Sequence, residues 1–180
     1  NGNVVLAFPG PAKGTRDEAM LDVLDRALQV PGGVVSSLRN RNASVHQMEM
    51  SRLLGINGGV LLFHLNCLPG KENVAGQELR LELGKLFQPR FRQQSLLNLI
   101  VGTITQFHLR QQNGQYYLLE LVRNILSGQG VEFTQRYLAA VKNTRLDDLE
   151  FLARRYWGVE IRQVINRPPT DSGQLTLDKN

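Results

Sequence analysis

The feature that most constrains the fold of this chain is a change in the spacing of its hydrophobic residues. Residues 4–8 and 60–68 are apolar runs of strand length, and residues 60–68 alternate between a fully apolar face and a mixed face. Between residues 73 and 156 the apolar side chains recur at intervals of three and four, which is the spacing of amphipathic helices. The pattern predicts a sheet covered by helices on one face.

The boundaries of the first elements follow from turn and cap residues. Pro9, Gly10 and Pro11 end the first strand, and Thr15 with Glu18 has the spacing of a capping box that starts a helix over residues 16–29. One or two helical turns are expected in residues 34–42. A hairpin then joins strands over residues 43–53 and 60–68, with strict alternation of side chains in the first of them.

Several helices and one last strand complete the predicted order. Thr144 is expected to cap the final helix, and residues 159–165 return to an extended pattern. In the helix before residue 128, we expect the apolar stripe to pack into the core; it consists of Tyr117, Leu118, Leu121, Val122 and Ile125. The order is a split β-α-β arrangement and predicts a two-layer α+β fold with a mostly antiparallel sheet.

Length and composition bound the organisation of the chain. With 180 residues, of which 42% are hydrophobic, residues 1–169 are expected to form a single α+β domain, followed by a polar, flexible tail at residues 170–180. The apolar runs are too short to span a bilayer, so we expect a soluble protein without a membrane partner, in either cytoplasm or periplasm. A first residue other than Met favours a piece of a longer polypeptide.

The net charge of +5 permits contact with nucleic acid. A basic α+β nucleic-acid-binding module is therefore one alternative, carried by Arg90, Phe91, Arg92, Tyr116 and Tyr117. Most basic residues are scattered along the chain, however, which is typical of solvated helix faces. We therefore favour a function without nucleic acid.

The sequence lacks the residues that hydrolytic chemistry needs. His46, His64 and His108 are widely separated, and Met50 stands where a zinc motif starting at His46 would need its second histidine. Positions four apart on a strand are about 13 Å distant, too far to share one ion. Cys67, the single cysteine, lies in an apolar run and suits neither a disulfide nor a nucleophile. We predict no catalytic residue and no metal ligand in this segment.

Arg39 and Arg41 lie between the first helix and the following strand. An exposed guanidinium at such a connection can bind a peptide carbonyl or carboxylate. A solvated basic loop is an equally acceptable interpretation.

The order of several short segments resembles the second, non-catalytic half of the pitrilysin and insulin-degrading-enzyme family of zinc metallopeptidases. The similarity extends over residues 4–167 and rests on VVLAFPGP (4–11), DEAMLDVL (17–24), GGVVSSLR (32–39), GGVLLF (58–63), YLAAV (137–141), DDL (147–149) and ARRY (153–156). It implies the half-domain fold of these peptidases, an α/β roll.

In that family two similar halves close like a clamshell and only one binds zinc, so the resemblance implies a segment that is inactive alone. It implies that zinc is bound by a catalytic partner half, either on the same chain or on a partner subunit, and that the substrate is a peptide. A dimer of this chain is a further possibility. Arg39 falls at the family's substrate-binding arginine, and His46 falls where the family has a tyrosine. The alternative within the family is a scaffold subunit whose whole assembly has lost catalysis.

Overall fold

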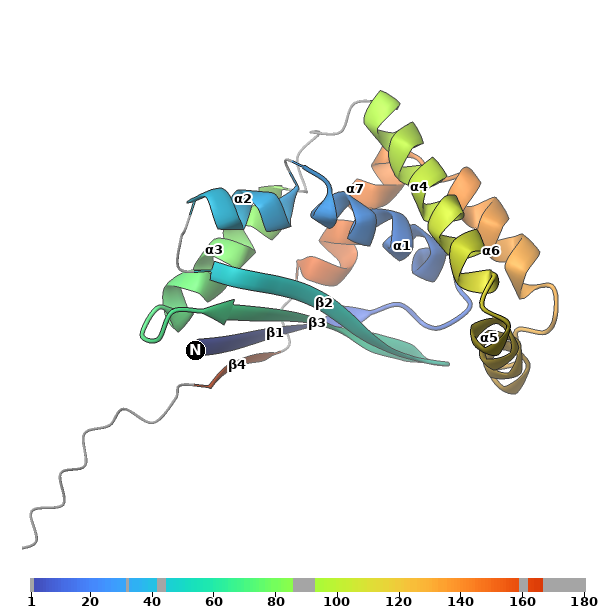
Figure 1. Cartoon of the computed structure of the whole chain (residues 1–180), viewed down its shortest axis with the longest axis horizontal. Helices are drawn as coiled ribbons and strands as arrows, with labels where there is room; N and C mark the ends of the chain where they lie inside the picture. Colours follow the sequence, from blue (N-terminus) through green and yellow to red (C-terminus); the bar gives the residue numbers. More distant parts are fainter. Residues whose placement is uncertain (1, 32, 42–44, 86–92, 159–161, 167–180) are drawn as a thin grey trace, which may run out of the picture.

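The fold is seen in a computed structural model, which describes residues 2–31, 33–41, 45–85, 93–158 and 162–166. Four strands and seven helices follow one another in this part of the chain (Figure 1). Their bounds are β1 Gly2–Gly10, α1 Arg16–Gln29, α2 Val34–Arg41, β2 Val45–Gly55, β3 Gly58–Cys67, α3 Glu72–Lys85, α4 Gln93–Gln111, α5 Gly114–Leu126, α6 Phe133–Lys142, α7 Leu146–Trp157 and β4 Arg162–Asn166.

The strands form one antiparallel sheet in the order β2-β3-β1-β4. The two central strands, β1 and β3, pair along their whole length, with Leu6 opposite Phe63. The hairpin strand β2 lies at one edge, so among the described residues no strand pairs with its outer side. Helices α1, α2, α3 and α7 lie over one face of the sheet (Figure 1). The predicted two-layer α+β fold is thereby confirmed.

The core lies between the helices and the inner face of the two central strands. Alternate residues of β1 and β3 are buried there, as the period of two predicts. Phe63 makes edge-to-face contacts with Phe8 and Trp157, at centroid distances of 5.6 and 5.5 Å. Each such pair adds about 0.5–1.5 kcal/mol beyond area burial. This aromatic chain joins the sheet to α7.

Helix α1 begins and ends where the sequence predicts. The hydroxyl of Thr15 accepts the N–H of Glu18, as a capping residue does. The predicted cap at Thr144 is wrong by one residue. The Thr144 hydroxyl instead donates to the carbonyl of Ala140 in α6, and the N–H of Arg145 donates to Asp148 at the start of α7. A threonine hydroxyl at the end of one helix can donate a hydrogen bond to the carbonyl four residues earlier. This bond competes with capping the next helix.

Strict alternation in β2 fails at its first residues. Val45 pairs with Cys67 while Gln47 pairs with the adjacent Asn66, so His46 is the additional residue of a β-bulge. Val45 is consequently turned inward and is 4% exposed, rather than sharing the outer face with Gln47. The sequence of one strand does not contain this irregularity, because a bulge is defined by pairing with a second strand.

The apolar stripe of α5 is the other departure from the prediction. Leu118, Val122 and Ile125 are exposed, and the single buried residue of the helix is Asn124. The helix is present as predicted, but its apolar side faces away from the core. Tyr116 and Tyr117 of the nucleic-acid alternative are also exposed. Its other three residues, Arg90, Phe91 and Arg92, lie outside the described residues, as does the predicted tail at 170–180.

Among the helices that the structure describes, none combines the length and hydropathy that crossing a membrane requires.

Candidate functional site

The two predicted substrate-binding residues lie near the junction of α2 with the edge strand. His46 is exposed on β2, at the bulge. Arg39 is in the last turns of α2, and its side chain lies outside the described part of the structure. Helix α2 packs against β2, and in Figure 1 its C-terminal end lies at the end of the sheet where β2 starts. The backbone thus brings Arg39 and His46 to one end of the molecule.

A groove of about 480 Å³ lies beside the edge strand, between α1, α2 and β2. Its apolar lining comes from Leu28, Val35, Met48 and Met50, and its polar lining from Asp25, Gln29 and Glu49. Methionine side chains are unbranched and polarizable, so they adapt to apolar groups of different shape. The groove therefore suits varied side chains. The alternation predicted for residues 43–53 puts Met48 and Met50 on one strand face, but it does not predict the groove.

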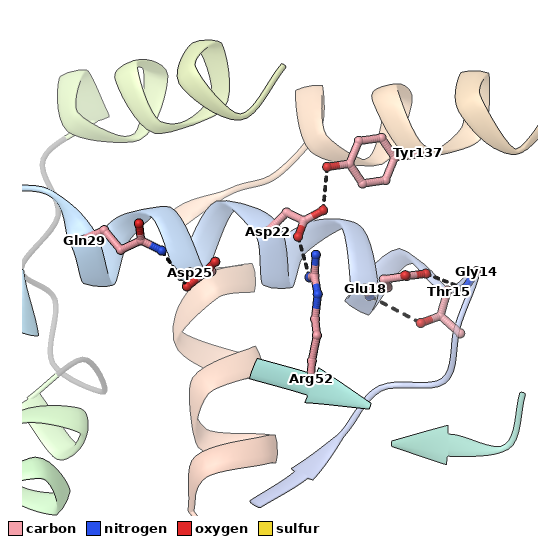
Figure 2. A network of polar contacts seen from close by, with 8 residues as sticks. All are labelled: Gly14, Thr15, Glu18, Asp22, Asp25, Gln29, Arg52 and Tyr137. Carbon is pink, nitrogen blue, oxygen red and sulfur yellow. Dashed lines mark hydrogen bonds and ion pairs between the residues drawn. The ribbon is translucent and has the colours of Figure 1, made fainter. Parts of the chain in front are cut away.

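A second cleft, of about 260 Å³, is walled by α1, α4, α5, α6 and β2. In its lining the Tyr137 hydroxyl donates to the Asp22 carboxylate at 2.6 Å, and the Arg52 guanidinium forms an ion pair with the same carboxylate (Figure 2). The Asp22 side chain is 18% exposed and that of Arg52 is 30% exposed. Three elements far apart in sequence are therefore joined at one carboxylate.

Helix α1 places two more acids on this side, one turn before Asp22 and one turn after it. Burial raises the pKa of Glu18, although the Gly14 N–H, which donates to it at 2.5 Å, opposes the shift. Burial also raises the pKa of Asp25, opposed by the Gln29 amide, which donates at 3.1 Å. Asp25 and Gln29 line both the groove and the cleft, so the two hollows adjoin along α1.

Two tyrosines on the helices opposite α1 are held as neutral donors. Burial and the neighbouring Asp22 carboxylate raise the pKa of Tyr137 far above its ordinary value. Burial and the hydrogen bond to Asp17, at 2.7 Å, raise the pKa of Tyr156 to about 12. Both phenols keep their protons at neutral pH. The bonds that they donate fasten α6 and α7 to α1.

The carboxylates of α1 do not form a metal site. The described residues contain no group of three or more His, Cys, Asp or Glu side chains placed to hold a metal ion. The Asp22 carboxylate is paired with Arg52 and accepts the Tyr137 hydroxyl, and the Asp25 carboxylate accepts the Gln29 amide. Zinc also prefers histidine and cysteine ligands, and α1 contains neither. The donor set does not fit a zinc ion.

The remaining candidate groups have structural surroundings. His64 lies on the open face of the sheet with its ring 3.0 Å from the Ser51 hydroxyl, and His108 is exposed on α4 beside Phe107. Cys67 is buried, and burial raises the pKa of its thiol, which disfavours the nucleophilic thiolate. Among the described residues, the arrangement presents the unpaired edge of β2 beside an adaptable groove.

Comparisons with known proteins identify the fold. No model of a protein family and no curated sequence matches the chain. Among solved structures, the inactive peptidase domain of a candidate zinc protease from Bordetella parapertussis has a TM-score of 0.82 at 19% identity, over 98% of this chain and 96% of that one. The inactive M16 peptidase domain from Pseudomonas fluorescens has a TM-score of 0.70 at 10% identity, over 91% of this chain and 40% of that one.

A third similar structure is a chain of complex III2 from Candida albicans, with a TM-score of 0.74 at 10% identity, over 91% of this chain and 42% of that one. The chain thus spans about two-fifths of the length of the last two structures. The fold implied by the sequence resemblance is confirmed. This chain has the fold of the inactive domains of zinc and M16 peptidases.

Proposed function

We propose that this domain is the non-catalytic half of a zinc metalloendopeptidase, in which it forms one wall of a closed chamber and helps to hold the peptide substrate. The observation that carries the proposal is the combination of an inactive-peptidase fold with the unpaired edge of β2 and its adjoining groove. Zinc is assigned to the partner half, because the donors on α1 of this domain do not suit it.

The edge strand supports a role in peptide binding. An extended peptide can add to the unpaired N–H and C=O groups of a sheet edge, while pockets beside the edge select its side chains. The groove beside β2 offers Met48 and Met50 as such a pocket, and Asp25 is part of its polar lining. The two methionines suit an apolar side chain of the peptide.

The open face of the sheet supports the role of a chamber wall. On this face, some side chains of paired residues in β2 and β3 are polar. The Asn66 amide donates to Gln47 at 3.3 Å, and Glu49 lies opposite His64. No described helix lies over this face (Figure 1). A wetted, partly polar surface is what the lining of a peptide chamber needs.

Within this proposal Arg39 donates charge-assisted hydrogen bonds to a carbonyl or the terminal carboxylate of the peptide. His46 donates one hydrogen bond in place of the family's tyrosine. The bulge at His46 supports this role, since bulges re-aim side chains at sheet edges.

The test is peptide hydrolysis by the assembled enzyme carrying Arg39→Ala or His46→Ala. A hydrogen bond to a charged group contributes about 1.5–3 kcal/mol, so Arg39→Ala should raise KM roughly 10- to 100-fold. Arg16→Ala, at an exposed arginine of α1, and His108→Ala, at an exposed histidine of α4, serve as controls. Equal effects of the target and control substitutions would reject the assigned roles.

One observation favours a second candidate function. The similar chain in complex III2 from Candida albicans belongs to a larger assembly, which suits a scaffold subunit of the same fold without peptidase activity. Zinc content separates the two: an assembly around this domain that holds no zinc and cleaves no peptide would favour the scaffold.

A further inference from the structure

The turn between β2 and β3 contains an asparagine followed by a glycine, Asn57 and Gly58. The two strands pair up to Gly55 and Gly58, so Ile56 and Asn57 form the turn at the tip of the hairpin. Asn57 is exposed, and Ile56 beside it is 67% exposed. Among the described residues, no group forms a hydrogen bond with the Asn57 side chain. The carboxamide of Asn57 is therefore open to water and can change its rotamer.

The residue after Asn57 has a main-chain conformation that favours glycine. The φ of Gly58 is +141°, a value that residues with a side chain rarely adopt. Glycine has no Cβ, so no side chain shields the nitrogen of Gly58. Asparagine is one of the heat-labile residues of proteins, because the nitrogen of the following residue can attack its carboxamide. The turn thus requires the residue type that leaves this nitrogen most accessible.

We propose that Asn57 is a site of spontaneous modification, at which the asparagine is converted to aspartate and isoaspartate. The Gly58 nitrogen attacks Cγ of Asn57, and the side-chain nitrogen leaves as ammonia together with the proton of the Gly58 N–H. The product is a cyclic succinimide. Water then opens the ring, at the bond to Cγ to give aspartate or at the bond to the main-chain carbonyl carbon to give isoaspartate. Water is the co-reactant, and no group is oxidised or reduced.

Both products alter the closure of the hairpin. Each adds a negative charge to the turn, and isoaspartate also lengthens the main chain by one carbon atom between residues 57 and 58. The turn is fastened to the segment before α1 by the N–H of Lys13, which donates to the carbonyl of Gly55 at 2.9 Å. Because the geometry of a short hairpin turn depends on its length, we expect isoaspartate to weaken this bond and to speed hydrogen exchange of the Lys13 amide. Equal exchange before and after conversion would contradict this effect on the turn.

The same dipeptide at the start of α5 provides a matched comparison. Asn113 is exposed like Asn57, but it is the N-cap of α5, and its side-chain oxygen accepts the N–H of Tyr116 at 3.1 Å. This bond must break before the Gly114 nitrogen can attack the carboxamide. An N-cap bond favours the capped state by about 2- to 30-fold, so Asn113 should react more slowly than Asn57 by about that factor.

The test is peptide mapping by mass spectrometry of the full chain, aged in a mildly alkaline buffer in which the domain stays folded. We expect aspartate and isoaspartate to accumulate about 2- to 30-fold faster at position 57 than at position 113. Ageing in concentrated urea is the control, because both dipeptides are then unfolded and should react at similar rates. The third such dipeptide, Asn1 with Gly2, is followed in its own peptide.

A second measurement uses a methyltransferase that is specific for isoaspartate. It should label the aged folded protein, and Asn57→Gln should lose most of this label, because the longer side chain closes the ring poorly. An unmodified Asn57 in the folded protein, or a rate at position 57 no higher than at position 113, would overturn the proposal. The same ratio of rates in urea as in the folded protein would also overturn it, because the difference would then come from the sequence and not from the fold. None of these outcomes bears on the function proposed above.

Discussion

The ion pair between Arg52 and Asp22 is predicted to stabilise the domain measurably, unlike the other arginine pairs at its surface. Arg52→Met keeps most of the apolar stem but takes the ion pair away from the Asp22 carboxylate, which is 18% exposed and still accepts the Tyr137 hydroxyl. Removing one partner of a fully buried pair costs about 3–5 kcal/mol, and an exposed pair is worth about 0–1 kcal/mol. For this partly exposed pair we expect a loss of about 2 kcal/mol.

The assays are urea unfolding and thermal unfolding of the wild type, Arg52→Met, Asp22→Asn and the double variant. A domain of this size loses about 2–4 °C in Tm per kcal/mol, so Arg52→Met should melt about 4–8 °C lower. The double variant should be more stable than the sum of the single effects predicts, by about 1–2 kcal/mol, because neither charge is then left alone.

The control is Arg16→Met. Arg16 pairs with Asp148 at 2.9 Å, but its side chain is 55% exposed, so the expected loss is below about 1 kcal/mol. If the loss of stability in the double variant equals the sum of the losses in Arg52→Met and Asp22→Asn within about 0.5 kcal/mol, the two side chains are not coupled and the reasoning is refuted.

Three further predictions concern pH and the core. Burial raises the pKa of Glu18 in the folded domain, so ionising this carboxyl group lowers the stability. The free energy of unfolding should therefore be highest below the ordinary pKa of 4.5, and part of it should be lost as the pH rises through the pKa of the folded state. Glu18→Gln should flatten this decline in urea midpoints measured from acid to neutral pH, and an unchanged slope would contradict the assignment. Tyr137→Phe should leave the ultraviolet titration of tyrosine unchanged up to about pH 11, because Tyr137 stays protonated there; a smaller amplitude in the variant would contradict this. Phe63→Ala should destabilise the domain by about 3–5 kcal/mol and shift the fluorescence of Trp157, which its ring contacts; a loss below about 1 kcal/mol would show that the site collapses without a cavity.

Local signals were sufficient to predict much of the fold. Helix α1 has its cap, its apolar spacing and its end within one stretch of sequence, and its predicted bounds are those observed. The strand β3 likewise shows its buried face through the alternation of Leu61, Phe63 and Leu65. These elements are determined by neighbours a few residues away, so the sequence alone suffices.

The features that escaped prediction depend on distant contacts. The bulge at His46 exists only in relation to β3, and Asp22 meets Tyr137 across 115 positions in the sequence. Periodicity predicted α5 correctly as a helix, but it does not state which environment its apolar side faces. Leu118, Val122 and Ile125 of the stripe assigned to the core are instead exposed.

The two candidate site residues came from the sequence, whereas the groove came from the fold. The sequence pointed to Arg39 and His46, and the structure brings their backbones to one end of the edge strand. Their contact with peptide remains a prediction. The groove beside β2 was not predicted, because Asp25 on α1 and Met48 on β2 become neighbours only through the tertiary fold.

The most direct test of the central claim is zinc content together with peptide hydrolysis, measured on this chain alone and on its assembly with the companion half. The account predicts neither zinc nor cleavage for the chain alone, and both, abolished by a chelator, for the assembly. Zinc-dependent cleavage by this chain alone would contradict it.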